Sequence, residues 1–274
     1  MPGAYGFELL GVAGAAPQLV ETAPDWPTLE IERIVGVTTP RRSVIGADGA
    51  EIELVAGDHL AVRRSPLQAT FTTARPLSDD ALIHPYLAPA AAIAGYWLGR
   101  EAFHAGGFVL DDGVWGVMGE KGSGKSSLLA GLAQQGYGVF ADDALILERD
   151  IVFAGPRSVD LRRESADELD AGASIGVVGD RERWRITLGN VPSASRLRGW
   201  VFLAWAEMLE VSPVAPGERL QRLLGHRMIK GLPPPEPRLM LELSALPAFQ
   251  LSRPRSWGQL ETAGSRLVDT LSPC

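Results

Sequence analysis

The sequence predicts an α/β fold, with a β-rich region over residues 1–86 and a mixed domain over residues 87–274. Three observations support this prediction. Short apolar segments rich in β-branched residues fill the N-terminal region. An Ala-rich segment of helical pattern follows it. Beyond that helix, a predicted strand runs into a glycine-rich loop that opens another predicted helix, which is the usual order in α/β proteins.

The composition excludes several classes of protein. The chain of 274 residues carries 33 acidic and 26 basic residues, a net charge of −7, so it lacks the basic footprint of a general nucleic-acid-binding protein. Its single cysteine, Cys274, permits neither an intrachain disulfide nor a zinc site built from cysteines. Met1–Leu10 lacks the basic start of a signal peptide, and the longest apolar stretch, Leu87–Leu98, is too short to span a bilayer. We therefore expect a cytoplasmic protein without a membrane partner.

Strands are predicted first in the N-terminal region. The segments are Leu29–Val37, Ile52–Val55, Leu60–Val62 and Ala69–Thr73. From Leu87 to Phe103 the pattern predicts a helix, with Pro89 in its first turn.

The middle of the chain predicts a strand–loop–helix unit. Phe108–Leu110 and Val114–Met118 flank an Asp-Asp-Gly turn and read as a hairpin. A helix is predicted over Ser126–Gln135, with Leu128, Leu129 and Leu132 on one face and Gly136 just after its end. The remaining predicted elements are strands at Tyr137–Ala141, Ala144–Leu147, Arg183–Leu188 and Gly199–Trp205, and helices at Ser165–Leu169, Gly217–Leu224 and Ser256–Leu271.

The loop after Met118 matches a phosphate-binding motif in full. Gly119–Ser126 reads G-x-x-x-x-G-K-[ST], the P-loop. Its glycines allow backbone N–H groups to surround phosphate oxygens, and the following helix adds the positive end of its dipole. In this motif the lysine, here Lys125, reaches the β- and γ-phosphates, and the hydroxyl of Ser126 ligates Mg²⁺. A glycine-rich turn that only resembles a P-loop is the alternative. The residues expected to contact the nucleotide are Gly119, Glu120, Lys121, Gly122, Ser123, Gly124, Lys125, Ser126 and Ser127.

Two carboxylates, Asp142 and Asp143, end the predicted strand after the P-loop helix. In a parallel α/β sheet that strand end lies beside the loop. One carboxylate could hold Mg²⁺, and the other could take a proton from an attacking hydroxyl. Adjacent residues of a strand point to opposite sides, so the two need not share a role. The alternative is a solvated acidic turn, and a lone histidine such as His104 is more often a packing or surface residue.

The segment Phe103–Leu147 resembles the catalytic core of HPr serine kinase/phosphorylase. That family has a histidine, a hairpin, the P-loop, a helix and a strand ending in Ala-Asp-Asp. Here His104 lies fifteen residues before Gly119, and Asp142 lies seventeen residues after Lys125, as in the family pattern. The stretch Gly136–Asp143 is similar to the segment that leads to the family's aspartate pair.

The resemblance implies an ATP- and Mg²⁺-dependent serine kinase whose P-loop core is similar to that of phosphoenolpyruvate carboxykinase. Asp142 would then be the general base, Asp143 would assist the metal together with Ser126, and His104 would orient groups or handle protons beside the phosphates. Lys125 would stabilise the transferred phosphoryl group. Arginines such as Arg157, Arg162 or Arg163 could supply a further cation.

The chain also departs from the family. The Arg-Gly-rich signature downstream of the aspartates is missing, and residues 155–163 stand in its place. The N-terminal region does not resemble the usual regulatory domain either. We therefore expect an acceptor serine on a peptide or protein other than HPr, as in the diverged HPr-kinase-related proteins that phosphorylate ribosomal precursor peptides, including lasso-peptide precursors. A P-loop NTPase and a non-catalytic nucleotide-sensing module are the alternatives. The oligomeric state stays open, a homo-oligomer included.

Overall fold

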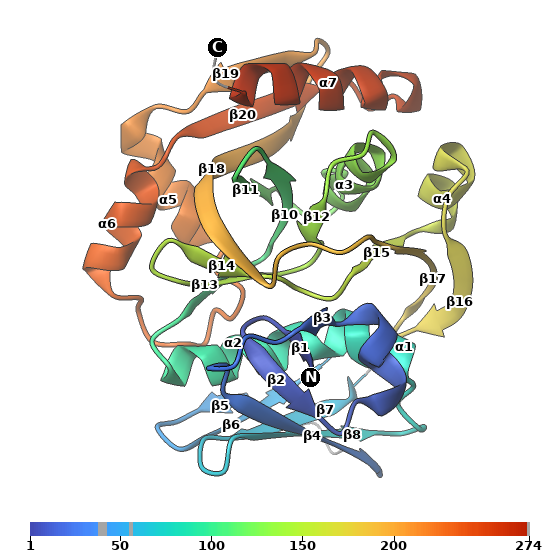
Figure 1. Ribbon diagram of the computed structural model, residues 1–274, viewed down its shortest axis with the longest axis vertical. Coiled ribbons are helices and arrows are strands. Elements are labelled where there is room, and N and C mark those ends of the chain that lie inside the picture. Colours follow the sequence, from blue (N-terminus) through green and yellow to red (C-terminus); the bar gives the residue numbers. More distant parts are fainter. Residues whose placement is uncertain (38–42, 55–56, 273–274) are drawn as a thin grey trace.

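The structure, a computed structural model, describes residues 1–37, 43–54 and 57–272 (Figure 1). It confirms the predicted α/β class: within the described residues the strands form one sheet of eight, one of nine and one of three. Val55, the end of one predicted strand, lies outside the described residues.

The N-terminal region forms the eight-stranded sheet, in the order β3-β1-β2-β4-β8-β7-β6-β5. Its strands are β1 (Pro2–Ala4), β2 (Phe7–Leu10), β3 (Val20–Glu21), β4 (Thr28–Val35), β5 (Val44–Ile45), β6 (Gly49–Glu53), β7 (His59–Arg63) and β8 (Gln68–Thr73), with the 3₁₀ helix η1 (Ala13–Gln18) between β2 and β3. In β8 alternate residues are buried, as the alternating sequence predicts for a sheet with one covered face. β1–β3 have no counterpart among the predicted strands.

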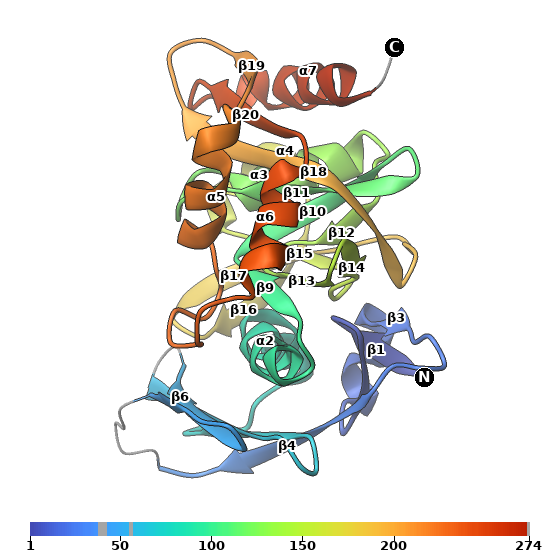
Figure 2. The same cartoon turned by 90° about the vertical axis from the view of Figure 1, so that its left-hand side faces the viewer.

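A helical segment covers this sheet. It comprises α1 (Asp79–Ala81), the π-helical turn η3 (Leu82–Tyr86) and α2 (Leu87–Trp97). α2 lies between the N-terminal sheet and the rest of the molecule (Figure 2), packing on β7 as well as on β9 and β13. Burial from both sides explains its Ala-rich composition, since Ala90, Ala91 and Ala94 are fully buried.

The predicted helix from Leu87 to Phe103 was too long. It ends at Trp97, because Gly99 adopts a left-handed conformation (φ +77°) and Arg100 donates its backbone N–H back to the Gly95 carbonyl. Glu101–Phe103 is instead a strand, β9. The division after residue 86 stays a prediction, although the core cluster of the N-terminal strands extends into α2.

The central sheet is mixed and has the order β12-β10-β11-β18-β14-β13-β9, with β20 beside β18 and β19 beside β20. Its members are β9, β10 (Ala105–Leu110), β11 (Gly113–Met118), β12 (Val139–Ala141), β13 (Leu145–Glu148), β14 (Ile151–Phe153), β18 (Ala194–Trp205), β19 (Glu210–Pro213) and β20 (Ala248–Arg253). The predicted hairpin is confirmed as β10 and β11, joined by a turn in which Asp111 has φ +53°. The predicted strand at 144–147 is present as β13, but it pairs with β9 and β14 rather than with β12.

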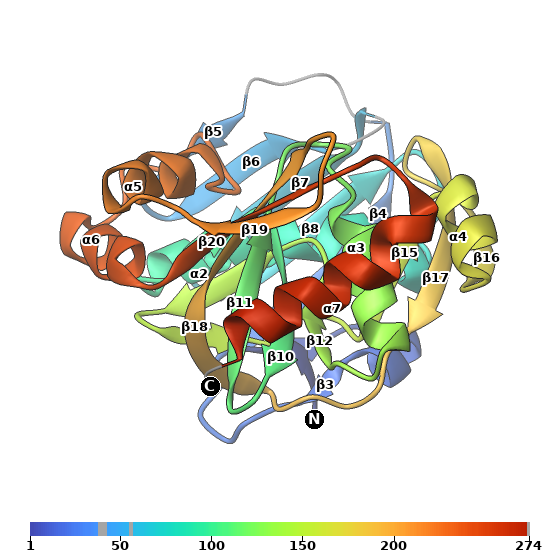
Figure 3. The same cartoon turned by 90° about the horizontal axis from the view of Figure 1, so that it is seen from above.

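Helices and a small sheet complete the molecule. α3 (Lys125–Gln134) packs between the central sheet and α7 (Leu260–Leu271), as Figure 3 shows from above. Leu128, Leu129 and Leu132 of α3 are buried as predicted, and each such burial is worth roughly 1.5–3 kcal/mol. The other elements are β15 (Ser158–Leu161), α4 (Arg163–Leu169), β16 (Ala173–Val178), β17 (Arg181–Thr187), α5 (Pro216–Gly225), α6 (Pro237–Ala245) and η4 (Trp257–Gln259). Among the described residues, no helix has both the length and the apolar character needed to cross a membrane.

The strand directions bring several strand ends to one edge. β11, β18 and β20 are parallel neighbours, so Met118, Trp205 and Arg253 end at the same side of the sheet. β12 is antiparallel to β10, which is antiparallel to β11, so β12 also runs in the direction of β11. The aspartate pair after β12 therefore reaches the P-loop edge, although the sheet is mixed rather than parallel as the sequence argument assumed.

Candidate active site

The P-loop connects β11 to α3 in the conformation that its glycines permit. Gly122 (φ +87°) and Gly124 (φ +82°) are left-handed, which other residues adopt only with strain. A Cβ at Gly119 would lie 2.4 Å from the Ser123 hydroxyl. The backbone N–H of Ser123 donates to the Glu120 carbonyl at 2.9 Å, and α3 begins at Lys125. The first N–H groups of a helix have no intrahelical partner, so this end suits an anion.

A cavity of about 550 Å³ opens beside the loop, within the usual size of small-molecule sites. Every P-loop residue from Glu120 to Ser127 lines it, together with His104 and both aspartates. Of the residues expected to contact the nucleotide, all but Gly119 therefore line one cavity, although Ser127 also hydrogen-bonds Ser165 of α4 at 3.3 Å. Further lining residues, which sequence reasoning did not select, are His84, Asp160, Arg181, Arg183, Trp205, Arg253, Arg255 and Trp257.

Lys125 lines the cavity together with both aspartates and interacts electrostatically with each of them. Its side chain is buried, and among the described residues its ammonium makes one long contact, of 3.5 Å, to the His104 carbonyl. Burial lowers the pKa of Lys125, while Asp143 and Asp142 oppose that shift. An ammonium so poorly bonded within the protein keeps donors for phosphate oxygens.

Asp142 is a buried carboxylate with one unused oxygen. Its Oδ2 accepts a hydrogen bond from the backbone N–H of Asp160 at 3.3 Å, whereas Oδ1 has no partner among the described residues. Burial raises the pKa of Asp142, and His84, the Ser126 hydroxyl and Lys125 partly offset that rise. A raised pKa gives the carboxylate more affinity for a proton, which is what a general base at neutral pH needs.

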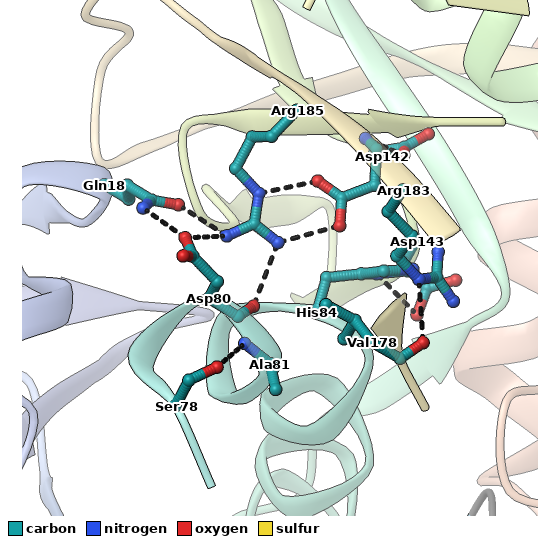
Figure 4. A network of polar contacts seen from close by, with 11 residues as sticks. Gln18, Ser78, Asp80, Ala81, His84, Asp142, Asp143, Val178, Arg183 and Arg185 are labelled. Carbon is teal, nitrogen blue, oxygen red and sulfur yellow. Dashed lines mark hydrogen bonds and ion pairs between the residues drawn. The ribbon is translucent and has the colours of Figure 1, made fainter. Parts of the chain in front are cut away.

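Asp143 is held by two histidines. His104 Nδ1 lies 3.4 Å from one of its oxygens, and His84 Nδ1 lies 3.6 Å from the other. Burial disfavours the ionised form, but His84, His104 and Lys125 outweigh it, and the pKa of Asp143 is lowered. Asp143 therefore stays ionised. His84 comes from the helical segment that precedes α2 (Figure 4), and sequence reasoning did not select it.

A network of polar contacts holds Asp160, whose backbone bonds Asp142 (Figure 4). Arg185 of β17 donates to both oxygens of Asp160, at 2.6 and 2.7 Å, and to the side chain and carbonyl of Asp80, at 2.9 Å each. The same guanidinium reaches Gln18 at 2.9 Å. Since the backbone of Asp160 holds Asp142, this network ties the aspartate to α1 and the N-terminal region. Charge spacing in the sequence gave no sign of it.

The arginines predicted as cation donors lie in different places. Arg162 lines the cavity. Arg157 does not serve there: it bonds to the carbonyls of Pro17 and Leu19 and to Asn190, beside a second hollow. Arg163 stacks on Trp184, with 5.3 Å from its guanidinium carbon to the ring centre. Proximity to the aspartates in sequence therefore does not place Arg157 at the cavity.

The oxygen donors in the cavity suit Mg²⁺. Ser126 and the aspartates offer hydroxyl and carboxylate oxygens, the class that this ion prefers, and the partnerless Oδ1 of Asp142 lies in the same group. Within the described part of the chain no three His, Cys, Asp or Glu side chains form a metal cluster by themselves. Nucleotide sites commonly complete the Mg²⁺ shell with phosphate and water, so this donor set fits that pattern. The Ser126 hydroxyl interacts with Asp142, while its pairing with Asp143 stays a prediction.

Comparisons with known proteins do not identify a family or a function for the chain. No family model matches the chain, and no curated protein matches it. Among solved structures, the Hpr(Ser) kinase/phosphatase from Coxiella burnetii matches over 62% of this chain and 95% of its own, at 15% identity and a TM-score of 0.31. A likeness this distant carries no argument about activity. The functional argument therefore rests on the motif and on the geometry of the cavity.

Proposed function

We propose that the chain is a kinase that transfers the γ-phosphoryl group of ATP, bound with Mg²⁺, to a serine hydroxyl on a peptide or protein. One observation carries the proposal: a complete P-loop shares its cavity with a buried carboxylate whose Oδ1 has no partner among the described residues. A pure nucleotide-binding module has no use for such a base beside the phosphates. A phosphotransferase needs one wherever its acceptor loses a proton.

The residues divide the work as follows. The P-loop backbone and Lys125 bind the β- and γ-phosphates and offset charge on the moving phosphoryl group. The acceptor oxygen forms a bond to the γ-phosphorus, the bond from that phosphorus to the β–γ bridging oxygen breaks, and ADP leaves. The acceptor proton passes to Asp142 Oδ1. Mg²⁺, held by Ser126 and a carboxylate, would neutralise charge on the phosphate oxygens.

Asp143 and its histidines complete the site. Because His84, His104 and Lys125 keep Asp143 ionised, its negative charge is available beside the phosphate site, where we assign it to assist the metal. We assign His104 to orienting groups beside the phosphates.

The direct test offers acceptors to the protein. The purified chain is incubated with ATP and Mg²⁺ and either HPr, a serine-containing peptide library, or the peptide encoded beside its gene. Mass spectrometry then looks for one added phosphate. We expect transfer to a peptide serine and none to HPr. ATP hydrolysis that no acceptor accelerates would replace the kinase by an NTPase, and ATP binding without any turnover would replace it by a nucleotide sensor.

A further inference from the structure

A buried arginine that forms no ion pair with any described residue lies against the P-loop. Arg253 is the last residue of β20, and the parallel pairing of β20 with β18 places it beside Trp205, the last residue of β18. Both strands end at the edge where β11 enters the loop. Arg253 is 4% exposed, and a Cβ on Gly124 would lie 2.3 Å from its guanidinium. The side chain therefore reaches the phosphate-binding turn itself.

The guanidinium is held in place but is poorly bonded. Its carbon lies 4.4 Å above the ring centre of Trp205, and the indole N–H of Trp205 donates to the Gly122 carbonyl at 3.2 Å. One Nη donates weakly to the Gly124 carbonyl at 3.4 Å. Nε is buried and has no partner among the described residues, which also provide no ion pair to this arginine. A guanidinium has five N–H donors, and most of these are unused here.

A buried guanidinium of this kind destabilises the fold unless a ligand supplies hydrogen-bond acceptors and negative charge. A buried charge without a partner destabilises the fold, and natural proteins pair it or place it where a ligand brings the opposite charge. Arg185 shows the first solution in the same molecule. For Arg253, the nearest site for an anion is the cavity that it lines with the P-loop and Trp205.

We propose that Arg253 is a ligand of the terminal phosphoryl group of a nucleoside triphosphate bound in the P-loop. The inference rests on the proposed function and deepens it, since it assigns the additional cation to β20 rather than to the arginines near residue 160. Trp205 fixes the plane of the guanidinium and couples it to Gly122. The planar fork can donate two parallel hydrogen bonds to phosphate oxygens, which a lysine cannot copy. Arg253 then distinguishes a triphosphate from a diphosphate.

The test compares two nucleotides on four proteins. Wild type, Arg253→Met, Arg253→Lys and Arg266→Met are titrated calorimetrically with Mg²⁺ and either ADP or the non-hydrolysable triphosphate AMP-PNP. Arg266 of α7 is the control, because it is an exposed arginine that does not line the cavity. We expect Arg253→Met to lose about 10- to 100-fold in affinity for AMP-PNP, the usual effect of removing a charged hydrogen bond, with ADP affinity changed less than about threefold. Arg253→Lys should fall between, and Arg266→Met should keep the wild-type preference.

Other outcomes have definite meanings. Equal losses for both nucleotides in Arg253→Met, with the fold intact by circular dichroism, would show that Arg253 only supports the loop, and would overturn the inference. Unchanged affinity for both would overturn it as well. In either case nucleotide binding by the wild type leaves the proposed function standing. A wild type that binds neither nucleotide would overturn the proposed function, and this inference with it.

Discussion

Two arginines of equal burial meet opposite surroundings. Arg185 is 5% exposed and Arg253 is 4% exposed. Arg185 makes two short hydrogen bonds to Asp160 and two to Asp80, whereas Arg253 lies against the P-loop with a partnerless Nε and no ion pair to any described residue. Arg185 therefore has its hydrogen-bond and ion-pair partners within the protein. Arg253 needs a bound anion to supply them.

The same contrast holds for the carboxylates. Asp160 is saturated by Arg185, while Asp142, linked to it through one backbone hydrogen bond, has an oxygen for which the described residues offer no partner. Polar groups that serve the fold are paired, because an unpaired buried group costs about 1–3 kcal/mol or more. Unpaired groups gathered around one cavity therefore mark the place where the molecule binds its substrate. Substitutions at paired and at unpaired buried groups should therefore have different effects.

The largest effect is expected from Asp142→Asn. If Asp142 accepts the acceptor's proton, its loss should slow phosphoryl transfer roughly 10²–10⁴-fold, with nucleotide affinity nearly unchanged. Single-turnover kinetics with the unmodified acceptor measures the rate of transfer, and calorimetry measures nucleotide affinity. A variant that transfers at the wild-type rate would move proton abstraction elsewhere, with His104 the next candidate. A large loss of Mg²⁺–nucleotide affinity would instead make Asp142 a metal ligand with Ser126.

Arg185→Met should destabilise the fold by about 3–5 kcal/mol, because it leaves Asp160 buried and unpaired. Urea unfolding followed by circular dichroism measures the change. The control is Arg196→Met, which removes an exposed ion pair with Asp150 and should change the free energy of unfolding by less than about 1 kcal/mol. Equal changes in the free energy of unfolding would show that the buried Arg185 network stabilises the fold no more than the exposed Arg196–Asp150 ion pair.

Arg253→Met should change the free energy of unfolding in the opposite direction to Arg185→Met, and by less. Burial lowers the pKa of Arg253 to about 10, below its value in the unfolded chain. Between those two pH values the unfolded state binds more protons, so the free energy of unfolding rises with pH there, and the full penalty of the charge is present at neutral pH. Removing the charge should then stabilise the nucleotide-free protein at pH 7 by about 1–3 kcal/mol. Urea unfolding that shows a loss of several kcal/mol would mean that Arg253 has a structural role.

Local sequence patterns predicted the part of the site that lies on neighbouring residues. The P-loop, the helix after it and the aspartate pair were found because glycine spacing and strand ends have direct geometric consequences. The helix from Leu87 was extended too far, because the apolar pattern continues into β9 and the stop at Gly99 is a single residue. Arg157, which the sequence offered as one of three possible cation donors, lies outside the cavity because nearness along the chain is not nearness in space.

The rest of the site comes from long-range pairing, which has no local signal. His84 reaches Asp143 from the helical segment, Arg185 joins β17 to α1, and Arg253 meets the loop because β20 pairs with β18. Each of these side chains is ordinary in its own sequence context. Their roles depend on strand order, and the sequence of a mixed sheet does not reveal which strands become neighbours.

Whether this edge of the sheet binds a nucleoside triphosphate is measured by titrating wild type and Lys125→Ala with Mg²⁺ and AMP-PNP in a calorimeter. Lys125 is buried at the start of α3, with one long contact of 3.5 Å to a carbonyl, so the variant should fold and its unfolding transition serves as the check. We expect saturable binding to the wild type and no measurable binding to the folded variant. Equal affinity of the two proteins would contradict this expectation.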